Sequence, residues 1–342
     1  MSTAAAAPAQ DPASALPVTR LDWPPLALIP AIALAALPLV GSLPTWVTLT
    51  VAGLAMGMMI FMMASGLTLV FGLMDVLNFA HGVFISVGAY GAATVLTRMT
   101  RQMQAESLAS DLSAMVPAVL AAIALAGLLG WFFERVLIRP VYGDHLKQIL
   151  ITMGGLIVFE QAIHVVWGPD IIPLPRPGTI TGAFIIGEAA IERYRMAAVI
   201  VGLVVFAAMW LLLNRTRIGL LVRAGVENPE MVESLGYRIR RLFVGVFVAG
   251  SGLAGLGGAM WAMYQEQVNA QMGAQMLVVI FIVVIIGGLG SVGGCFVGAL
   301  LIGLATNYTG YLAPKLALGS SILIMVLVLL WRPRGLYPIG RA

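Results

Sequence analysis

The stretch Gly66–Tyr90 reads GLTLVFGLMDVLNFAHGVFISVGAY and is apolar almost throughout. At its centre Asp75, Asn78 and His81 fall within seven residues, and glycines punctuate it at four positions. A bilayer tolerates a polar break in an apolar run only where the break is buried in protein or lines a cavity. Polar groups at membrane depth are unfavourable, so a transport pathway is the default explanation for them. The stretch therefore predicts a broken or kinked membrane segment that faces an internal path.

The composition of the whole chain predicts a polytopic membrane protein. Its 342 residues are 60% hydrophobic and only 10% charged, with a mean hydropathy of +0.99, whereas soluble domains carry about 25% charged residues. No soluble core could enclose this much apolar surface. The single cysteine, Cys295, excludes an intrachain disulfide and a cysteine metal cluster, so we expect a small packing residue there.

Charge-free runs mark the expected crossings, because a helix needs about 20 apolar residues to span a bilayer. We expect an all-α transmembrane bundle of about 8–10 spans with broken or re-entrant segments. Two spans lie between residues 22 and 75 with a turn near 41–45, two between 267 and 314 split at 287–294, and the others at 76–97, 112–133, 148–167, 196–214, 242–265 and 316–331.

The chain divides into a tail and one membrane domain. Residues 1–22, rich in Ala and Pro, are expected to form a disordered tail, and residues 23–335 the transmembrane domain. Within that domain, residues 215–241 form a polar, basic segment between two spans. The proline-rich residues 168–195 are expected to form an extended loop with a short hairpin near residues 179–187.

Lysine and arginine in the loops predict the orientation. With ten spans, basic clusters at residues 135–147, 215–241 and 332–334 all fall on one side, which is the cytoplasm by this rule. The N- and C-termini are then cytoplasmic, and the 168–195 loop lies outside. Arg98 and Arg101 also fall outside, against the rule.

Asp75, Asn78, His81 and Gly82 form the first candidate site. Positions 75, 78 and 82 would share one face of a helix, which suits a break that lines a pore. The alternative is a cytoplasmic turn between two helices, with Asp75 or Asn78 as the N-cap. Both interpretations hold if the break lies near the cytoplasmic mouth.

A capped helix is expected within the basic segment. Asn228 is a good N-cap, Pro229 suits the first helical position, and Glu230 complements the positive start of a helix. Gly236 can end the helix in the left-handed conformation. The result is a helix of about two turns, which is either a surface helix between spans or a docking helix that transmits force from a partner.

Other motifs carry less chemistry. Glu160 and His164, four residues apart, form either a proton relay or a hydrated pair near the end of a span. Residues 250–259, GSGLAGLGGA, form small-residue stripes that let helices approach closely. Residues 287–294, GGLGSVGG, lack the Lys–Ser/Thr of a phosphate-binding loop. Neither an enzyme nor a nucleotide hydrolase is predicted.

Four patches in this order resemble the membrane permeases of branched-chain amino acid ABC importers. They are GLTLVFGLMDVLNFAHG at 66–82, ERVLIRPVY at 134–142, RAGVENPEMVESLGY at 223–237 and IIGGLGSVGGCFVGALLIG at 285–303. The chain is most similar to the permease type with the NFAHG-like motif, from about residue 51 to the C-terminus. It departs at Val83, where many members have Glu, and at Val232, where the usual residue is Ala.

The resemblance implies a subunit of an ATP-driven importer in the bacterial inner membrane, specific for branched-chain or other hydrophobic amino acids. A second homologous permease would complete the path, two cytoplasmic ATPase subunits would bind ATP, and a periplasmic binding protein would deliver the solute. No cofactor, metal or nucleic acid is implied. The alternatives are an importer of urea, short amides or aromatic acids, or, in a different class, a self-sufficient secondary transporter or channel that uses Glu160 and His164.

The residue patterns and the resemblance together assign roles to residues. The translocation path is expected at Asp75, Asn78, His81, Gly82 and Gln161. Coupling to the ATPase is expected at Arg223, Glu227, Asn228, Glu230, Leu235 and Gly236, which makes the capped helix a coupling helix.

Overall fold

The computed structural model describes residues 23–104, 107–227 and 229–338. The helices are α1 (Trp23–Val40), α2 (Leu43–Met74), α3 (His81–Arg98), α4 (Thr100–Met103), α5 (Leu108–Phe132), α6 (His145–Trp167), α7 (Arg193–Arg215), α8 (Arg217–Glu227), α9 (Pro229–Ser234), α10 (Ile239–Gln265), α11 (Met272–Gly287), α12 (Val292–Leu312) and α13 (Ala317–Trp331). A π-helical turn (Phe133–Ile138) and a 3-10 turn (Arg139–Val141) extend α5. Two short antiparallel sheets pair β1 (Ile172–Pro173) with β4 (Gln267–Val268) and β2 (Ala183–Ile186) with β3 (Ala189–Glu192).

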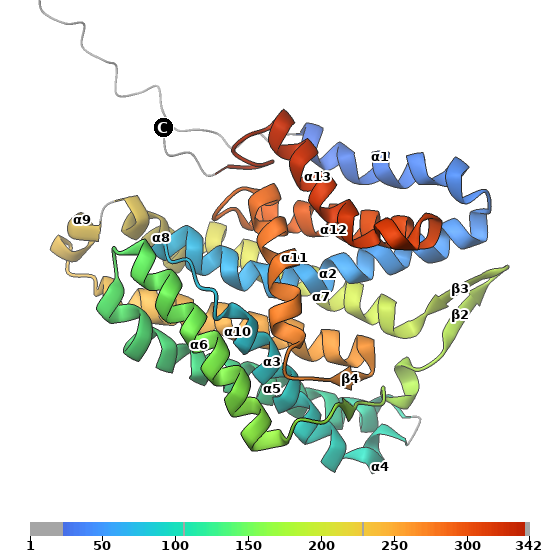
Figure 1. The fold of residues 1–342 in the computed structure, drawn as a ribbon, viewed down its shortest axis with the longest axis horizontal. Helices are drawn as coiled ribbons and strands as arrows, with labels where there is room; N and C mark the ends of the chain where they lie inside the picture. The colour runs from blue at the N-terminus through green and yellow to red at the C-terminus, as the bar shows by residue number, and fades with distance from the viewer. Residues whose placement is uncertain (1–22, 105–106, 228, 339–342) are drawn as a thin grey trace, which may run out of the picture.

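The expected all-α membrane bundle is confirmed (Figure 1). Within the described residues, six helices are long and apolar enough to cross a membrane: Leu43–Met74, Leu108–Val141, His145–Trp167, Arg193–Arg215, Ile239–Gln265 and Val292–Leu312. Three shorter apolar helices lie at Pro24–Val40, Met272–Gly287 and Gly319–Trp331. The expected turn after α1 is present. The expected hairpin is also present, but as β2–β3 it lies a few residues later than predicted, over residues 183–192, and it projects from the bundle. Helix α8 was not expected, because the charge clusters around it favoured a loop.

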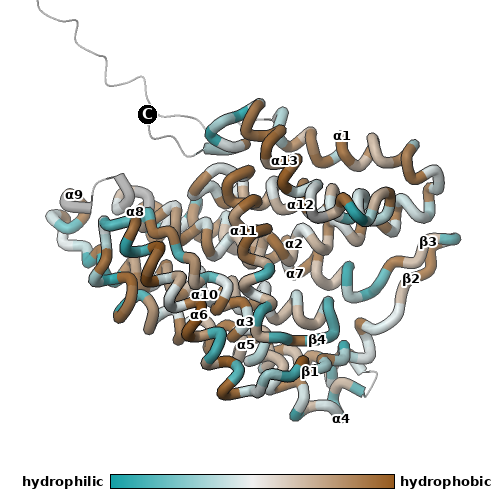
Figure 2. Tube along the Cα trace, viewed as in Figure 1, coloured by the Kyte–Doolittle hydropathy of each residue, from teal (hydrophilic) through white to brown (hydrophobic). Residues whose placement is uncertain are grey.

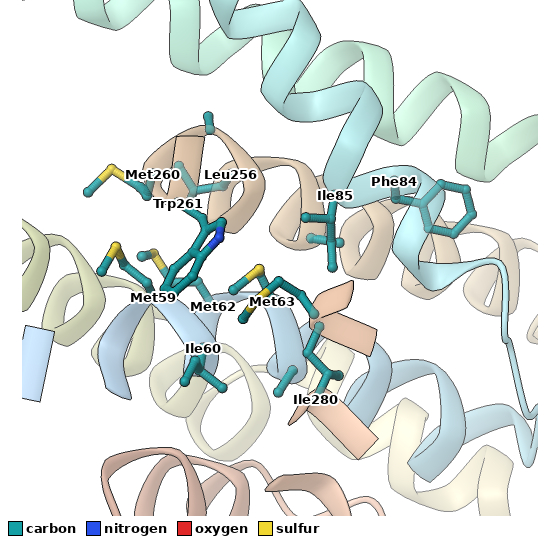
Figure 3. Close-up of a cluster of buried hydrophobic side chains, with 14 of the residues drawn as sticks. Met59, Ile60, Met62, Met63, Phe84, Ile85, Leu256, Met260, Trp261 and Ile280 are labelled. Atoms are coloured by element: carbon teal, nitrogen blue, oxygen red, sulfur yellow. The ribbon is translucent and has the colours of Figure 1, made fainter. Parts of the chain in front are cut away.

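Helices α2 and α10 form the centre of the bundle and run antiparallel. Helix α10 packs against α3 and α5, while α7, α11 and α12 pack against α2. Their side chains build the buried apolar cluster of Figure 3, where methionines of α2, such as Met59 and Met63, meet Trp261 of α10. Phe84 and Ile85 of α3 join the same cluster. Hydrophobic contact alone does not hold helices together in lipid, so close van der Waals packing of this kind matters.

Small residues bring the helix backbones together, as the stripe at 250–259 predicts. A Cβ on Gly88 of α3 would overlap the Cα of Gly255 on α10, and one on Gly250 would lie 2.7 Å from the carbonyl oxygen of Gly66 on α2. On the other side of α2, a Cβ on Gly57 would lie 2.9 Å from the carbonyl oxygen of Ala299 on α12. The central helices therefore touch through backbone atoms.

Helix α3 begins inside the bundle and not at its end. The Nε2 atom of His81, its first residue, lies 2.9 Å from the carbonyl oxygen of Met63. Met63 precedes the last residue of α2 by eleven positions, which is about 16 Å along a helix axis. Residues 75–80 are therefore a re-entrant segment that returns from the end of α2 into the interior.

The basic clusters lie together at one end of the bundle, hereafter the basic end. Asp75 lies 3.8 Å from His145 at the start of α6, and charges of Arg139 and Arg240 act on Tyr142 there. The C-terminal segment joins them through a 2.8 Å hydrogen bond from the Leu336 amide to Ile286. Hydrophilic segments are concentrated around α8 and α9 at this end and around β1 and β4 away from it (Figure 2).

The close contact of α3 with α10 yields the first prediction. We expect Gly88→Ala to lower the thermal unfolding midpoint in detergent by about 5 °C, because overpacking costs about 1–3 kcal/mol. Gly154→Ala is the matched control: it also places a methyl group on a helix, but in open space. A midpoint for Gly88→Ala at or above that of Gly154→Ala would contradict the packing.

Candidate functional site

The break between α2 and α3 starts with a strained residue. Asp75 has φ 53 and ψ 36, in the left-handed region, and its amide donates to the carbonyl of Phe71 as the C-cap of α2. Two expectations from the sequence are therefore wrong. Asp75 and Asn78 are not N-caps, since Ala80 holds that position in α3. Positions 75, 78 and 82 do not share a helical face, because residues 75–80 are not helical.

Asn78 organises the buried part of this break. Its side chain is fully buried, and its Oδ1 accepts a 3.0 Å hydrogen bond from the amide of Ala80. Its own carbonyl accepts from the amide of His81 at 3.3 Å. An Asn side chain that bonds the backbone two residues ahead stabilises a turn. The Nδ2 atom of Asn78 and the Nδ1 atom of His81 are buried with no partner among the described residues.

Neighbouring elements hold the same break in place. The amide of Phe79 donates to the hydroxyl of Thr152 on α6 at 3.2 Å. Gly82, in the first turn of α3, packs backbone to backbone against Gly273, in the first turn of α11; a Cβ on Gly82 would lie 2.8 Å from Gly273. Only glycine allows this approach. The structure thus brings Asp75, Asn78, His81 and Gly82 together into one segment.

Gln161 lies apart from these four residues. It sits on α6 with an exposed side chain. It is nine residues from Thr152, where α6 meets the break, or about 14 Å along the helix. The structure therefore does not bring Gln161 together with the other four candidate residues. Glu160 and His164 also lie on α6, and no ion pair joins them in the described part of the chain.

The basic segment folds into α8 and α9. The amides of Gly236 and Tyr237 donate to the carbonyls of Glu233 and Val232 at 2.9 and 3.2 Å, and Gly236 has φ +86. This is a Schellman C-cap, so the predicted left-handed end of the helix is confirmed. Leu235 is 69% exposed beside it.

The other coupling candidates are placed only by their helices. Arg223 and Glu227 lie on α8, and Glu230 lies on α9. Asn228, the expected N-cap, lies outside the described residues. Helices α8 and α9, which carry the described positions, project at the basic end (Figure 1).

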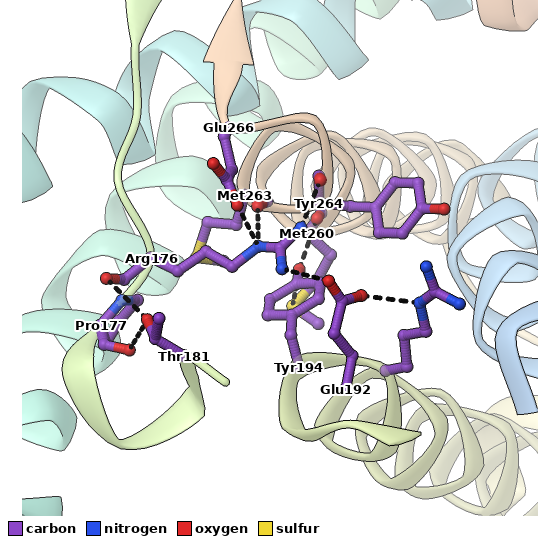
Figure 4. A network of polar contacts seen from close by, with 10 residues as sticks. Arg176, Pro177, Thr181, Glu192, Tyr194, Met260, Met263, Tyr264 and Glu266 are labelled. Atoms are coloured by element: carbon purple, nitrogen blue, oxygen red, sulfur yellow. Dashed lines mark hydrogen bonds and ion pairs between the residues drawn. The ribbon is translucent and has the colours of Figure 1, made fainter. Parts of the chain in front are cut away.

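A polar cluster around Arg176, away from the basic end, was missed by sequence reasoning (Figure 4). The side chain of Arg176 is only 11% exposed and donates to the carbonyls of Met263 and Tyr264 at 3.0 and 2.7 Å. It also pairs with Glu192 at 3.1 Å and Glu266 at 3.2 Å. Arg176 therefore caps the C-terminus of α10 and holds the 168–192 loop on it.

The carboxylate of Glu192 is stabilised in its charged form. Burial opposes that form, but a hydrogen bond from Arg176 and the charges of Arg195 and Arg176 outweigh it, so the pKa of Glu192 is lowered. A carboxyl group with a lowered folded-state pKa stabilises the fold fully above its unfolded pKa. This contribution is lost as the pH falls through the folded-state pKa.

Among the described residues no group of three His, Cys, Asp or Glu could hold a metal ion. The described residues contain a break inside the bundle that has one residue with positive φ and two unpaired polar atoms. They also contain a projecting capped segment at the basic end and, away from it, a loop that Arg176 holds on α10.

Comparisons with known proteins agree with this picture. The family model described as branched-chain amino acid transport system / permease component matches residues 49–331. The chain is 28% identical to the high-affinity branched-chain amino acid transport system permease protein BraD of Pseudomonas aeruginosa, over 84% of this chain and 94% of that protein. It is 26% identical to LivH of Escherichia coli K12, a permease protein of the same description, over 83% and 92%.

The chain is also similar, at lower identity, to a permease of a second name. The chain is 24% identical to the probable branched-chain amino acid transport permease protein LivM of Methanocaldococcus jannaschii, over 81% of this chain and 90% of that protein. No solved structure matches the chain.

The Arg176 cluster yields a second prediction. Lysine keeps the charge but loses the planar fork that reaches two carbonyls and two carboxylates, so Arg176→Lys should lower the free energy of unfolding by about 2 kcal/mol. Arg195→Lys is the control, because Arg195 is more exposed and, among the described residues, bonds Glu192 alone. Denaturation in detergent compares them. Equal effects of the two variants would argue against a clamp at Arg176.

Proposed function

The chain belongs to the family of permease components of branched-chain amino acid transport systems, and we propose that it forms the translocation path of an ATP-driven importer together with a second, homologous permease. Subunits of this family have no catalytic activity and carry no cofactor. The protein is a multi-pass membrane protein. Residues 23–335 form its permease domain in this proposal.

Branched-chain or other hydrophobic amino acids are the proposed solutes. The permeases BraD and LivH are named for branched-chain amino acid transport. The similarity to both LivH-type and LivM-type permeases supports a pair of homologous permeases. A periplasmic binding protein is proposed to dock on the outer surface, which includes the exposed β2–β3 hairpin.

The observation that carries the proposal is the re-entrant break at residues 75–82. It begins at the basic end and reaches the interior, where Asn78 and His81 keep unpaired polar atoms. We assign the path to Asp75, Asn78, His81 and Gly82. Gln161 joins them if the path follows the exposed face of α6 beside the partner permease.

The basic end is proposed to be cytoplasmic, because Lys and Arg concentrate in cytoplasmic loops. The N- and C-termini then lie in the cytoplasm of a bacterium. The segment from α8 to Gly236 is proposed to dock in the ATPase subunits, with Arg223, Glu227, Asn228, Glu230, Leu235 and Gly236 as the coupling residues. Closure of the ATPases on ATP would pull this segment and rock the bundle.

Reconstitution tests the function. We expect ATP-dependent uptake of leucine into proteoliposomes that contain this chain, its partner permease and the two ATPase subunits, with the binding protein added outside. The chain alone should accumulate nothing, because it has no energy source. Uphill uptake by the chain alone would establish the alternative, a self-sufficient transporter. Uptake of urea or an aromatic acid in place of leucine would change the assigned solute and leave the proposed importer function in place.

Gly236 tests the coupling assignment. Alanine in the left-handed region costs about 1–2 kcal/mol, enough to depopulate the capped helix end about tenfold. Gly236→Ala should therefore lower ATP-dependent uptake several-fold, and Gly236→Asn should retain it, because Asn tolerates this conformation. Gly41→Ala is the control: its φ is +70 in open space, between α1 and α2. Full uptake and normal ATPase assembly in Gly236→Ala would remove the assignment.

A further inference from the structure

A second break, after α10, has the same backbone geometry as the break after α2. Helix α10 ends at Glu266 with φ 56, just as α2 ends at Asp75 with φ 53. These two carboxylate residues are the non-glycine residues with positive φ in the described part of the chain. Each donates its amide to the carbonyl four residues earlier. The same capping geometry therefore closes both central helices.

The sequence after each cap also matches. Both breaks have the pattern acid-x-x-Asn-x-x-x-Gly, as DVLNFAHG at 75–82 and EQVNAQMG at 266–273. In both, the next helix begins six residues after the acid and the glycine lies in its first turn. Asn269 thus corresponds to Asn78, and each has one buried amide atom with no partner among the described residues.

The two breaks enter the bundle from opposite ends. Asp75 lies at the basic end beside His145, whereas Glu266 pairs with Arg176 in the loop cluster away from it. Antiparallel α2 and α10 explain this, because each break follows the C-terminus of one of them.

The first turns of α3 and α11 meet in the interior. Gly82 packs against Gly273 there. The hydroxyl of Ser86 donates to the carbonyl of Ala270 at 2.9 Å and accepts from the amide of Gly273 at 3.0 Å. One backbone contact and one hydroxyl therefore join the inner ends of both breaks.

Different restraints hold the two breaks. In the second break, β4 pairs with β1, and the amide of Leu174 donates to the backbone carbonyl of Glu266 at 2.8 Å. The first break has the bond from Phe79 to Thr152 and the half-exposed pair of Asp75 with His145. Residues that precede the hairpin thus clamp the second break, and α6 holds the first. A different neighbour therefore restrains each break.

We propose that residues 266–273 form the outer gate of the path, paired with residues 75–82 as the inner gate, and that both move about the Gly82–Gly273 contact so that one opens as the other closes. Asn269 is the positioning residue of the outer gate. The unpaired amide atoms of Asn78 and Asn269 gain partners when their own break moves, since buried polar atoms are rarely left unsatisfied. The inference rests on the proposed transport function.

Cysteine accessibility tests the pairing in the complete importer. In a Cys295→Ala background, Leu77→Cys reports the inner break and Gln267→Cys the outer break. The rate of reaction with a hydrophilic maleimide is measured in nanodiscs, without nucleotide and after trapping with ATP and vanadate. We expect the two rates to change in opposite directions, each by about fivefold or more for a substantial population shift. Asp170→Cys, in the loop after α6, and Lys147→Cys, in the first turn of α6, should change little.

Two outcomes would overturn the pairing: rates that rise or fall together, or a change at Leu77→Cys with none at Gln267→Cys. ATP-dependent uptake by the same complex in proteoliposomes separates the failures. Intact uptake with rates that do not oppose each other refutes the paired gates alone, whereas absent uptake in the unsubstituted complex refutes the proposed function.

A pivot variant gives an independent reading. Gly273→Ala should slow uptake several-fold and reduce the nucleotide-dependent change at both reporters. Gly293→Ala, a helical glycine with open space around it, should behave like the parent. Wild-type rates in a folded Gly273→Ala complex would refute the pivot. If this variant fails to assemble, the reporter pair in the parent still decides the proposal.

Discussion

Every backbone N–H and C=O within a bilayer needs a hydrogen-bond partner, and the centre of this protein is arranged around that constraint. Extended segments cannot satisfy themselves, so the two breaks can exist only inside the bundle. Asn78, Thr152 and Ser86 supply bonds that a continuous helix would have supplied for itself. The interior polar groups are therefore the consequence of bending the chain at membrane depth.

Backbone contacts make such a bend compact. The central helices approach through glycine and alanine, so the N-termini of α3 and α11 can meet at Gly82 and Gly273. Helices that touch through backbone atoms have little side-chain packing to rearrange at that point. A contact of this kind suits a pivot, and a larger residue would replace it with interlocked side chains.

Contacts at both ends of the bundle connect exposed segments to the central helices. Near the basic end, α8 and α9 project from the bundle with an exposed Leu235. Away from it, Arg176 joins the 168–192 loop to the end of α10. Each device links an exposed segment to a central helix. Family membership and the lack of catalytic activity in its subunits agree with a gate that responds to partners.

The sequence alone determined the membrane class, the approximate positions of most of the long apolar helices, the break at 75–82 and the glycine cap at 236, because hydropathy, charge and glycine are local signals. Only the tertiary structure decided that Asp75 ends a helix, that Gln161 lies apart from the break, and that Arg176 clamps α10. It also paired 266–273 with 75–82, although the acid–Asn–Gly spacing was visible in the chain. Such facts depend on contacts between residues up to almost two hundred positions apart, and periodicity within a segment carries no information about them.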